Sequence, residues 1–233
     1  MLETDFLNGA PMNRNPNGEH VANPRVFKSH LSFNALPAGD YKKVFVFREP
    51  ADAILSLAKF VPSLWGILDP PSISQLCTFF LFAGDVARML GSLAEAWEAL
   101  HRSDILFLFY EDIQSDPGLA VRRLARFMDI DADDELISTV VDQTSHASMS
   151  ALHSVFASRA QATNIHRAQG LDVDLHRVVG KVRKDGGRTG EGSALSADFA
   201  AACQRAWQFY ITSRLGFRNY AELRAAHRRT AAC

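Results

Sequence analysis

The sequence predicts an α/β fold in a single domain, with a central parallel sheet covered by helices on both faces. Two short runs, residues 43–47 and 105–110, are continuously apolar, which is typical of strands buried on both sides. Helical patterns fill the sequence between and after these runs, and a strand, helix, strand order indicates a parallel crossover. The 233 residues are enough for one generous domain.

The first 24 residues are expected to be irregular. They hold three prolines, two glycines and five asparagines, which favour turns and show little hydrophobic periodicity. We therefore divide the chain into an irregular segment, 1–24, and a single domain, 25–233. The segment 43–47 is then the first strand of that domain.

Helices are expected on both sides of the second strand. After the first strand, a helix is predicted to begin at Glu49-Pro50, because proline fits the first helical turn, and to end at Pro62. One long helical pattern covers residues 72–101. Beyond the second strand, Asp116-Pro117 opens a further helix, and residues 131–141 form another.

The C-terminal part combines a loop and a closing helix. Residues 180–192 contain five glycines and four basic side chains, which indicates a loop. Ser196 is a suitable N-cap for a helix through Leu215, and Gly216 is a suitable stop.

Charge and composition exclude several classes of protein. The formal net charge of −1 argues against a surface devoted to nucleic acid. That value hides an asymmetry, because residues 1–176 sum to −8 and residues 177–233 to +7. The C-terminal part is therefore where an anion would be attracted.

Three cysteines without a C-x-x-C pair suggest neither a disulfide framework nor a zinc site. No apolar run approaches the roughly 20 residues of a membrane helix, and the N-terminus lacks the pattern of a signal peptide. We expect a cytoplasmic protein without a metal and without membrane or nucleic-acid partners.

Four groups of residues are candidates for chemistry. Lys28 and His30 share one side of an extended segment, so both can reach one reacting centre, with His30 as a base. Arg48 ends the first strand and Ser56 lies two helical turns further on, a pair able to hold a phosphate. Locally, a surface ion pair between Arg48 and Asp52 explains this arginine slightly better.

The third and fourth groups are Tyr110 and the glycine-rich loop. Tyr110 ends the second strand, where it can offer its ring or hydroxyl to a nucleotide, while Glu111 and Asp112 can cap the next turn. Arg183 and Lys184 in the glycine-rich loop can wrap an anion, or the loop is simply solvated.

In this order the motifs resemble the cytosolic-type sulfotransferase family. The matching segments are Phe27-Lys-Ser-His-Leu31, Val44-Phe-Val-Phe-Arg-Glu-Pro-Ala-Asp-Ala-Ile-Leu-Ser56, Leu108-Phe-Tyr-Glu-Asp112, Thr144-Ser-His-Ala-Ser-Met149 and Arg183-Lys184. The resemblance implies a P-loop-like, three-layer sulfotransferase fold. It also implies 3′-phosphoadenosine 5′-phosphosulfate (PAPS) as the sulfuryl donor and a small hydroxyl- or amine-bearing molecule as the acceptor, and it leaves a homodimer open.

The resemblance also implies a role for each matched residue. His30 corresponds to the catalytic base, and Lys28 to the lysine that stabilises charge on the transferred group. Arg48 and Ser56 correspond to the pair that holds the 3′-phosphate, with Arg183 and Lys184 in the basic loop over it. Tyr110 and Thr144 correspond to nucleotide contacts.

One family feature is missing from the printed sequence. A strand and a phosphosulfate-binding loop with Lys, Gly and Ser/Thr are expected ahead of the Lys-x-His motif, and the 27 residues before Lys28 contain no such loop. The sequence therefore predicts a sheet without its first strand and loop. Two alternatives stay open: a truncated or degenerate sulfotransferase-like protein without catalysis, and a kinase-like nucleotide-binding domain, which the absence of G-x-x-x-x-G-K-[ST] disfavours.

Overall fold

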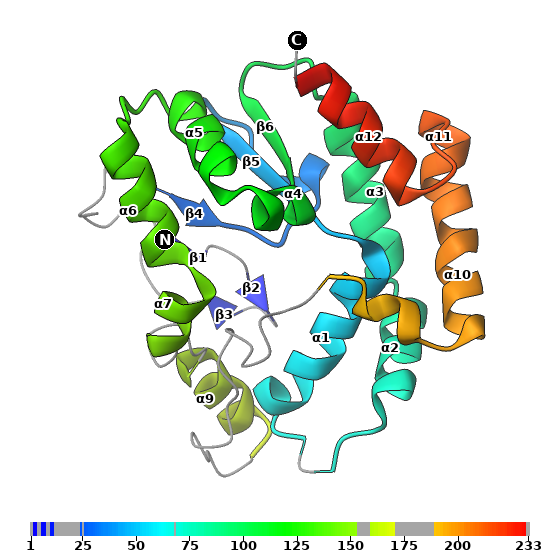
Figure 1. The fold of residues 1–233 in the computed structure, drawn as a ribbon. Helices are drawn as coiled ribbons and strands as arrows, with labels where there is room; N and C mark the ends of the chain where they lie inside the picture. Colours follow the sequence, from blue (N-terminus) through cyan, green and yellow to red (C-terminus); the bar gives the residue numbers. More distant parts are fainter. Residues whose placement is uncertain are drawn as a thin grey trace.

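The computed structural model describes residues 2–3, 6–7, 10–11, 24, 26–67, 69–152, 159–170 and 189–231. Within them the fold is α/β and mostly helical, with helices gathered around a short parallel sheet (Figure 1). Arg183 and Lys184 lie outside the described residues. The predicted division at residues 24 and 25 stays a prediction.

Strands β5 (Lys43–Phe47) and β6 (Ile105–Phe109) are hydrogen-bonded in parallel, as the apolar runs predict. Their register pairs Phe47 with Phe109, so both strands end level with each other. Phe47, Phe107 and Phe109 are at most 3% exposed and belong to the main hydrophobic core. Burying each such ring contributes about 1.5–3 kcal/mol, so this face of the sheet anchors the fold.

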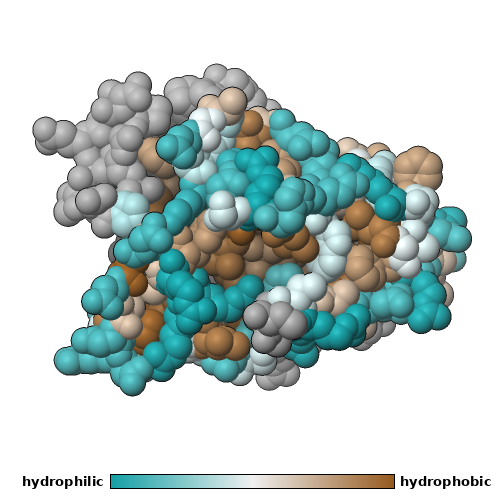
Figure 2. Space-filling view, turned by 90° about the horizontal axis from the view of Figure 1, so that it is seen from above, coloured by the Kyte–Doolittle hydropathy of each residue, from teal (hydrophilic) through white to brown (hydrophobic). Residues whose placement is uncertain are grey.

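The other face of the sheet is covered unevenly. Leu108 of β6 is buried, whereas Val44 and Val46 of β5 are 45% and 50% exposed. The expectation of cover on both faces is therefore wrong for β5. From above, Figure 2 shows hydrophobic side chains gathered in the middle of one face of the molecule, inside a hydrophilic rim.

Helix α1 (Pro50–Trp65) follows β5 directly. Glu49 is its N-cap and accepts the backbone N–H of Asp52, and Pro50 fills the first position as predicted. The predicted end at Pro62 is wrong, because the helix continues for one more turn to Gly66, which has a φ of 70°. Near the C-terminal end, proline removes only one helical hydrogen bond, and its carbonyl still accepts the Gly66 N–H.

The long helix predicted over residues 72–101 is two helices, α2 (Ile73–Phe82) and α3 (Asp85–Glu98). Gly84 between them has a φ of 87°, a left-handed conformation that glycine adopts without strain. The two helix axes differ by 56°. Among the described residues no single helix is long and apolar enough to cross a membrane, although this bent pair together has the length and composition.

Between β6 and residue 170, the described residues form α4 (Tyr110–Ser115), α5 (Pro117–Phe127), α6 (Asp134–Thr144), α7 (His146–Ala151) and α9 (Arg159–Ala168). Asp116 caps α5 and accepts the Leu119 N–H, which confirms the predicted start. The helix predicted at 131–141 is shifted, because Asp133 is its cap.

The C-terminal part closes over α3 and the sheet. A 3₁₀ turn, η2 (Glu191–Ala194), precedes α10 (Ala197–Trp207), the π-helical turn η3 (Gln208–Thr212), α11 (Ser213–Leu215) and α12 (Tyr220–Ala231). Ser196 caps α10, and Gly216 has a φ of 84°, as the predicted cap and stop require. The predicted helix therefore exists, with a π turn near its end.

Short strands flank this assembly. β1 (Leu2–Glu3) pairs in parallel with β4 (Phe27–Lys28), β2 (Phe6–Leu7) pairs in antiparallel fashion with β3 (Ala10–Pro11), and a 3₁₀ turn, η1 (Phe33–Ala35), follows β4. Residues 1–24 were expected to be irregular, so strands β1, β2 and β3 are a correction. Asn8-Gly9 stands between β2 and β3 in the sequence, and this dipeptide is a signal for a two-residue hairpin.

Candidate functional site

Arg48 and Tyr110 meet at the carboxyl ends of β5 and β6. Because Phe47 and Phe109 are paired in register, the next residue on each strand leaves the sheet at the same edge. The Arg48 guanidinium carbon lies 4.6 Å from the centre of the Tyr110 ring. A cation over an aromatic face is attracted by about 0.5–2 kcal/mol, which orients this guanidinium. Ligands of open α/β sheets bind at this edge.

Arg48 also lies beside Asp52 in the first turn of α1. One guanidinium nitrogen is 3.7 Å from Asp52 Oδ2, and the two side chains are only 15% and 2% exposed. The ion pair expected between them therefore exists, but inside the molecule and not on its surface. The sequence did not reveal this burial.

Asp52 holds a distant segment of the chain as well. Its carboxylate oxygens accept the backbone N–H groups of Gly190 and Gly192, each at 2.6 Å. Lys59, two turns further along α1, forms an ion pair of 3.0 Å with Glu191. In Figure 1, η2 lies against the beginning of α1.

Ser56 lies one turn beyond Asp52 on α1 and is half-buried. Residues four apart on a helix share a face, so Ser56 and Asp52 lie on the same side of α1. The N-terminus of this helix carries a partial positive charge and favours a bound anion. Arg48 and the first turn of α1 therefore lie together at this edge of the sheet, and Ser56 lies two turns into the helix.

Half-buried carboxylates lie at the strand ends. Glu49 donates its backbone N–H to Glu111 Oε1, at 3.0 Å, and burial raises the pKa of the Glu49 carboxyl, with the charges of Asp52 and Glu111 acting in the same direction. Glu111 also accepts a hydrogen bond from the Tyr220 hydroxyl. Glu111 therefore connects α1, α4 and α12.

Asp112, the residue after Glu111, also binds α12. It accepts hydrogen bonds from Arg224 Nε at 2.9 Å and from Arg228 Nε at 3.0 Å. Burial pushes the pKa of the Asp112 carboxyl upward, but these two arginines outweigh burial and lower it. Glu111 and Asp112 thus link helices.

Lys28 and His30 belong to a different part of the structure. Lys28 is the second residue of β4 and half-buried, and His30 follows in an extended segment with an exposed side chain. β4 pairs with β1, in a sheet separate from β5 and β6.

Thr144 ends α6 and donates its hydroxyl to the Val140 carbonyl at 2.7 Å. It lines an open hollow of about 490 Å³ with Asp142, Gln143, Ser148 and Leu152. In Figure 1, α6 and α7 lie at the left edge of the molecule, away from the start of α1. The structure therefore brings Arg48 and Tyr110 together at one end of the sheet, with Ser56 two turns into α1, and it places Thr144 in a different part of the fold.

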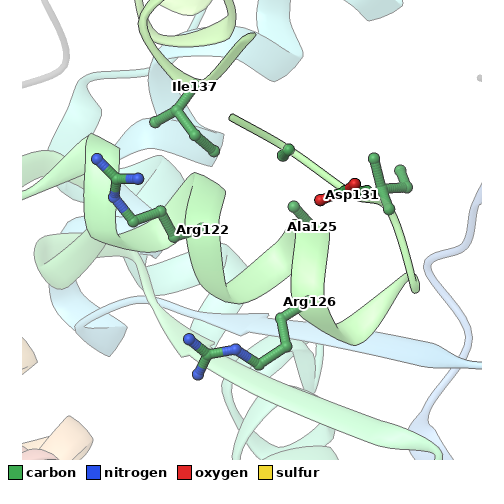
Figure 3. A pocket seen from close by; sticks show the side chains of 7 residues that line it. Arg122, Ala125, Arg126, Asp131 and Ile137 are labelled. Carbon is green, nitrogen blue, oxygen red and sulfur yellow. The ribbon is translucent and has the colours of Figure 1, made fainter. Parts of the chain in front are cut away.

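A second hollow lies between α5 and α6. It measures about 260 Å³, and Arg122 and Arg126 extend from α5 beside it, with Asp131 and Ile137 on its other walls (Figure 3). None of the predicted site residues lines it. Among the described residues, no group of three or more His, Cys, Asp or Glu side chains is arranged to hold a metal ion.

Comparison with known proteins identifies the family. The sulfotransferase domain matches residues 5–177. This chain belongs to the sulfotransferase family. The predicted resemblance to the sulfotransferase family is thereby confirmed, and the roles of the single residues stay predictions.

Curated sulfotransferases match about half of the chain. Sulfotransferase 1E1 of Bos taurus is 31% identical over 137 residues, which are 55% of this chain and 45% of that protein. Sulfotransferase 1C2 of Oryctolagus cuniculus is 33% identical over 137 residues, with the same two shares. This sulfotransferase chain thus spans under half the length of those relatives.

Solved sulfotransferase structures share the fold. Mouse sulfotransferase SULT7A1, complexed with PAP, matches this chain with a TM-score of 0.61 at 18% identity. The match covers 89% of this chain and 70% of the SULT7A1 chain. Retinol dehydratase in a complex with retinol and PAP matches with a TM-score of 0.58 at 20% identity. This match covers 79% of this chain and 52% of the retinol dehydratase chain. These likenesses establish a sulfotransferase fold with a parallel sheet.

Proposed function

We propose that this protein transfers a sulfuryl group from PAPS to a hydroxyl or amine of a small acceptor molecule. The observation that carries the proposal is the position of Arg48, which lies over the Tyr110 ring at the ends of two parallel strands and beside the start of α1. A guanidinium fork, a helix N-terminus and the Ser56 hydroxyl together suit a phosphate monoester. In this proposal they hold the 3′-phosphate of the donor.

The donor supplies an activated sulfuryl group, and the chain supplies binding, charge and a base. His30 accepts the proton of the acceptor hydroxyl or amine as that atom bonds to sulfur. The bond between sulfur and the bridging phosphate oxygen breaks, and adenosine 3′,5′-bisphosphate leaves. Lys28 stabilises the charge that develops on the transferred group.

The remaining assignments are also proposals. Tyr110 and Thr144 contact the nucleotide, and Arg183 with Lys184 adds positive charge at the 3′-phosphate. A cytoplasmic location and a homodimer remain predictions. SULT7A1 and retinol dehydratase, which share this fold, are both complexed with PAP, and this supports a nucleotide of the same type as the ligand of this chain.

The 3′-phosphate site is tested by calorimetry with adenosine 3′,5′-bisphosphate. Arg48→Ala removes a charge-assisted contact and is expected to weaken binding by about 10- to 100-fold. Arg122→Ala is the matched control, because Arg122 is an exposed arginine paired with Asp134 on α5 and α6. Equal affinities of wild type and Arg48→Ala would contradict the assignment.

Turnover distinguishes the proposed enzyme from a degenerate relative. A wild-type chain that binds adenosine 3′,5′-bisphosphate through Arg48 and transfers sulfuryl from PAPS to a panel of phenols and amines supports the enzyme. Binding through Arg48 without transfer to any acceptor supports the catalytically inactive alternative.

A further inference from the structure

We propose that Asp52 is a positioning residue that holds the two sides of the 3′-phosphate site, Arg48 and the turn Gly190–Gly192, in one arrangement. The inference rests on the proposed function, because it concerns the same nucleotide. It goes beyond it by assigning a role to a carboxylate at a site that binds an anion. Three observations support it.

The first observation is the burial of Asp52. It is 3% exposed, and a carboxylate removed from water is costly unless hydrogen bonds and positive charge compensate it. Gly190 N–H and Gly192 N–H each donate to a separate oxygen of the carboxylate at 2.6 Å, and Arg48 supplies the charge at 3.7 Å. The carboxylate thus links α1 to two residues that lie 138 and 140 positions further along the chain.

The second observation is the close approach of Gly192 to α1. A Cβ at this position would lie 2.7 Å from the Ala51 carbonyl carbon and from the Asp52 nitrogen. Both are backbone atoms, so no side-chain rotation relieves the contact. Only glycine lets the turn come near enough to donate to Asp52.

The third observation is the geometry around Arg48. Asp52 lies beyond hydrogen-bond distance from the guanidinium, while the Tyr110 ring lies 4.6 Å from its central carbon. Asp52 therefore orients the guanidinium by charge, and the Tyr110 ring orients it through its aromatic face. Its own oxygens are engaged by the two glycine N–H groups, so the arrangement does not depend on a tight Arg48–Asp52 pair.

The experiment compares two probes, adenosine 3′,5′-bisphosphate and adenosine 5′-monophosphate, by calorimetry on the full chain. The ratio of their affinities reports the 3′-phosphate site alone. A general loss of structure weakens both probes and leaves the ratio unchanged. A positioning role changes the ratio.

Asp52→Asn places an amide N–H₂ opposite one of the glycine N–H groups and removes the charge that orients Arg48. We expect the affinity ratio to fall by about tenfold. Gly192→Ala displaces the turn and leaves Asp52 intact, and it should lower the ratio similarly. Because both variants disturb one contact, the double variant should lose less than the product of the two effects.

Controls separate the possible failures. Asp133→Asn changes another aspartate that accepts a backbone N–H at a helix start, far along the chain, and should leave the ratio unchanged. Wild type without preference for the bisphosphate overturns the proposed function and this inference together. A ratio that falls in Arg48→Ala but is kept or raised in Asp52→Asn and Gly192→Ala overturns this inference alone. If Asp52→Asn does not fold, Gly192→Ala decides.

Discussion

At the scale of single residues, His30 gives the sharpest prediction about the reaction. Its side chain is exposed, two residues beyond Lys28, where an acceptor molecule can reach it. A positioned general base contributes about 10²–10⁴-fold in rate, so His30→Ala should lower kcat by that factor. Steady-state kinetics with PAPS and a phenolic acceptor measure the effect. The affinity for adenosine 3′,5′-bisphosphate should not change, because His30 is assigned to the acceptor.

His101 provides the control for this prediction. It is an exposed histidine at the turn before β6, and His101→Ala should keep the wild-type kcat. An unchanged kcat in His30→Ala would remove His30 from the mechanism. A parallel loss in both variants would indicate an effect unrelated to proton transfer.

The sequence predicts the spatial neighbours of some of these residues better than those of others. Arg48 and Tyr110 could be predicted to meet, because each directly follows an apolar run and parallel strands end at the same edge. Asp52 could only be assigned a surface pairing with Arg48, since its true partners, Gly190 and Gly192, lie far along the chain. No local pattern in the sequence records a contact over that separation. The role of Asp52 is therefore visible only in the structure.

At the scale of elements, Glu111 and Tyr220 hold α12 against the end of β6. Tyr220 donates its hydroxyl to Glu111, and burial, followed by this carboxylate, raises the pKa of Tyr220. Tyr220→Phe removes the donor from a partly buried carboxylate and should lower the free energy of unfolding by about 1–2 kcal/mol. Urea unfolding followed by circular dichroism measures the change.

Tyr41→Phe is the matched control, because Tyr41 is exposed and water replaces the hydrogen bond that its hydroxyl donates to Pro37. Its stability should stay within about 0.5 kcal/mol of wild type. If Tyr220→Phe is equally neutral, the Glu111 contact does not hold α12 in place.

Hydrophobic periodicity predicts that a helix is present better than it predicts where the helix ends. The pattern over residues 72–101 is apolar at helical spacing throughout, yet the chain turns at Gly84, and periodicity does not record the change of axis. The same limitation explains Pro62, which breaks a helix when its missing hydrogen bond matters but is tolerated in a buried last turn. The type of element was predictable in both cases, and its bounds depended on tertiary packing.

At the scale of the whole molecule, His227 links stability to pH. It is 5% exposed and lies among the rings of Trp97, Phe107 and Phe109, so it joins α3, β6 and α12. Burial lowers the pKa of His227 to about 4, Arg123 acts in the same direction, and Asp112 opposes both. In the unfolded chain the ordinary value is 6.5.

The sign of the effect follows from these two values. Between about pH 6.5 and pH 4 the unfolded chain binds a proton that folded His227 does not, so acidification favours unfolding. The free energy of unfolding should fall by about 3 kcal/mol across this range as a result of this residue. Above pH 7 the imidazole is neutral in both states, and its contribution no longer changes.

His227→Phe keeps a ring in the aromatic cluster and removes the proton-binding group. Urea unfolding at pH 7.5 and pH 5 should show a clearly smaller loss of stability on acidification in His227→Phe than in wild type. The carboxylates of Glu98, Asp104 and Asp112 do not confound this comparison, because both proteins contain them and their lowered pKa values place the loss of their contribution below about pH 5. An identical pH dependence in the two proteins would show that protonation of His227 does not drive the acid-induced loss of the fold.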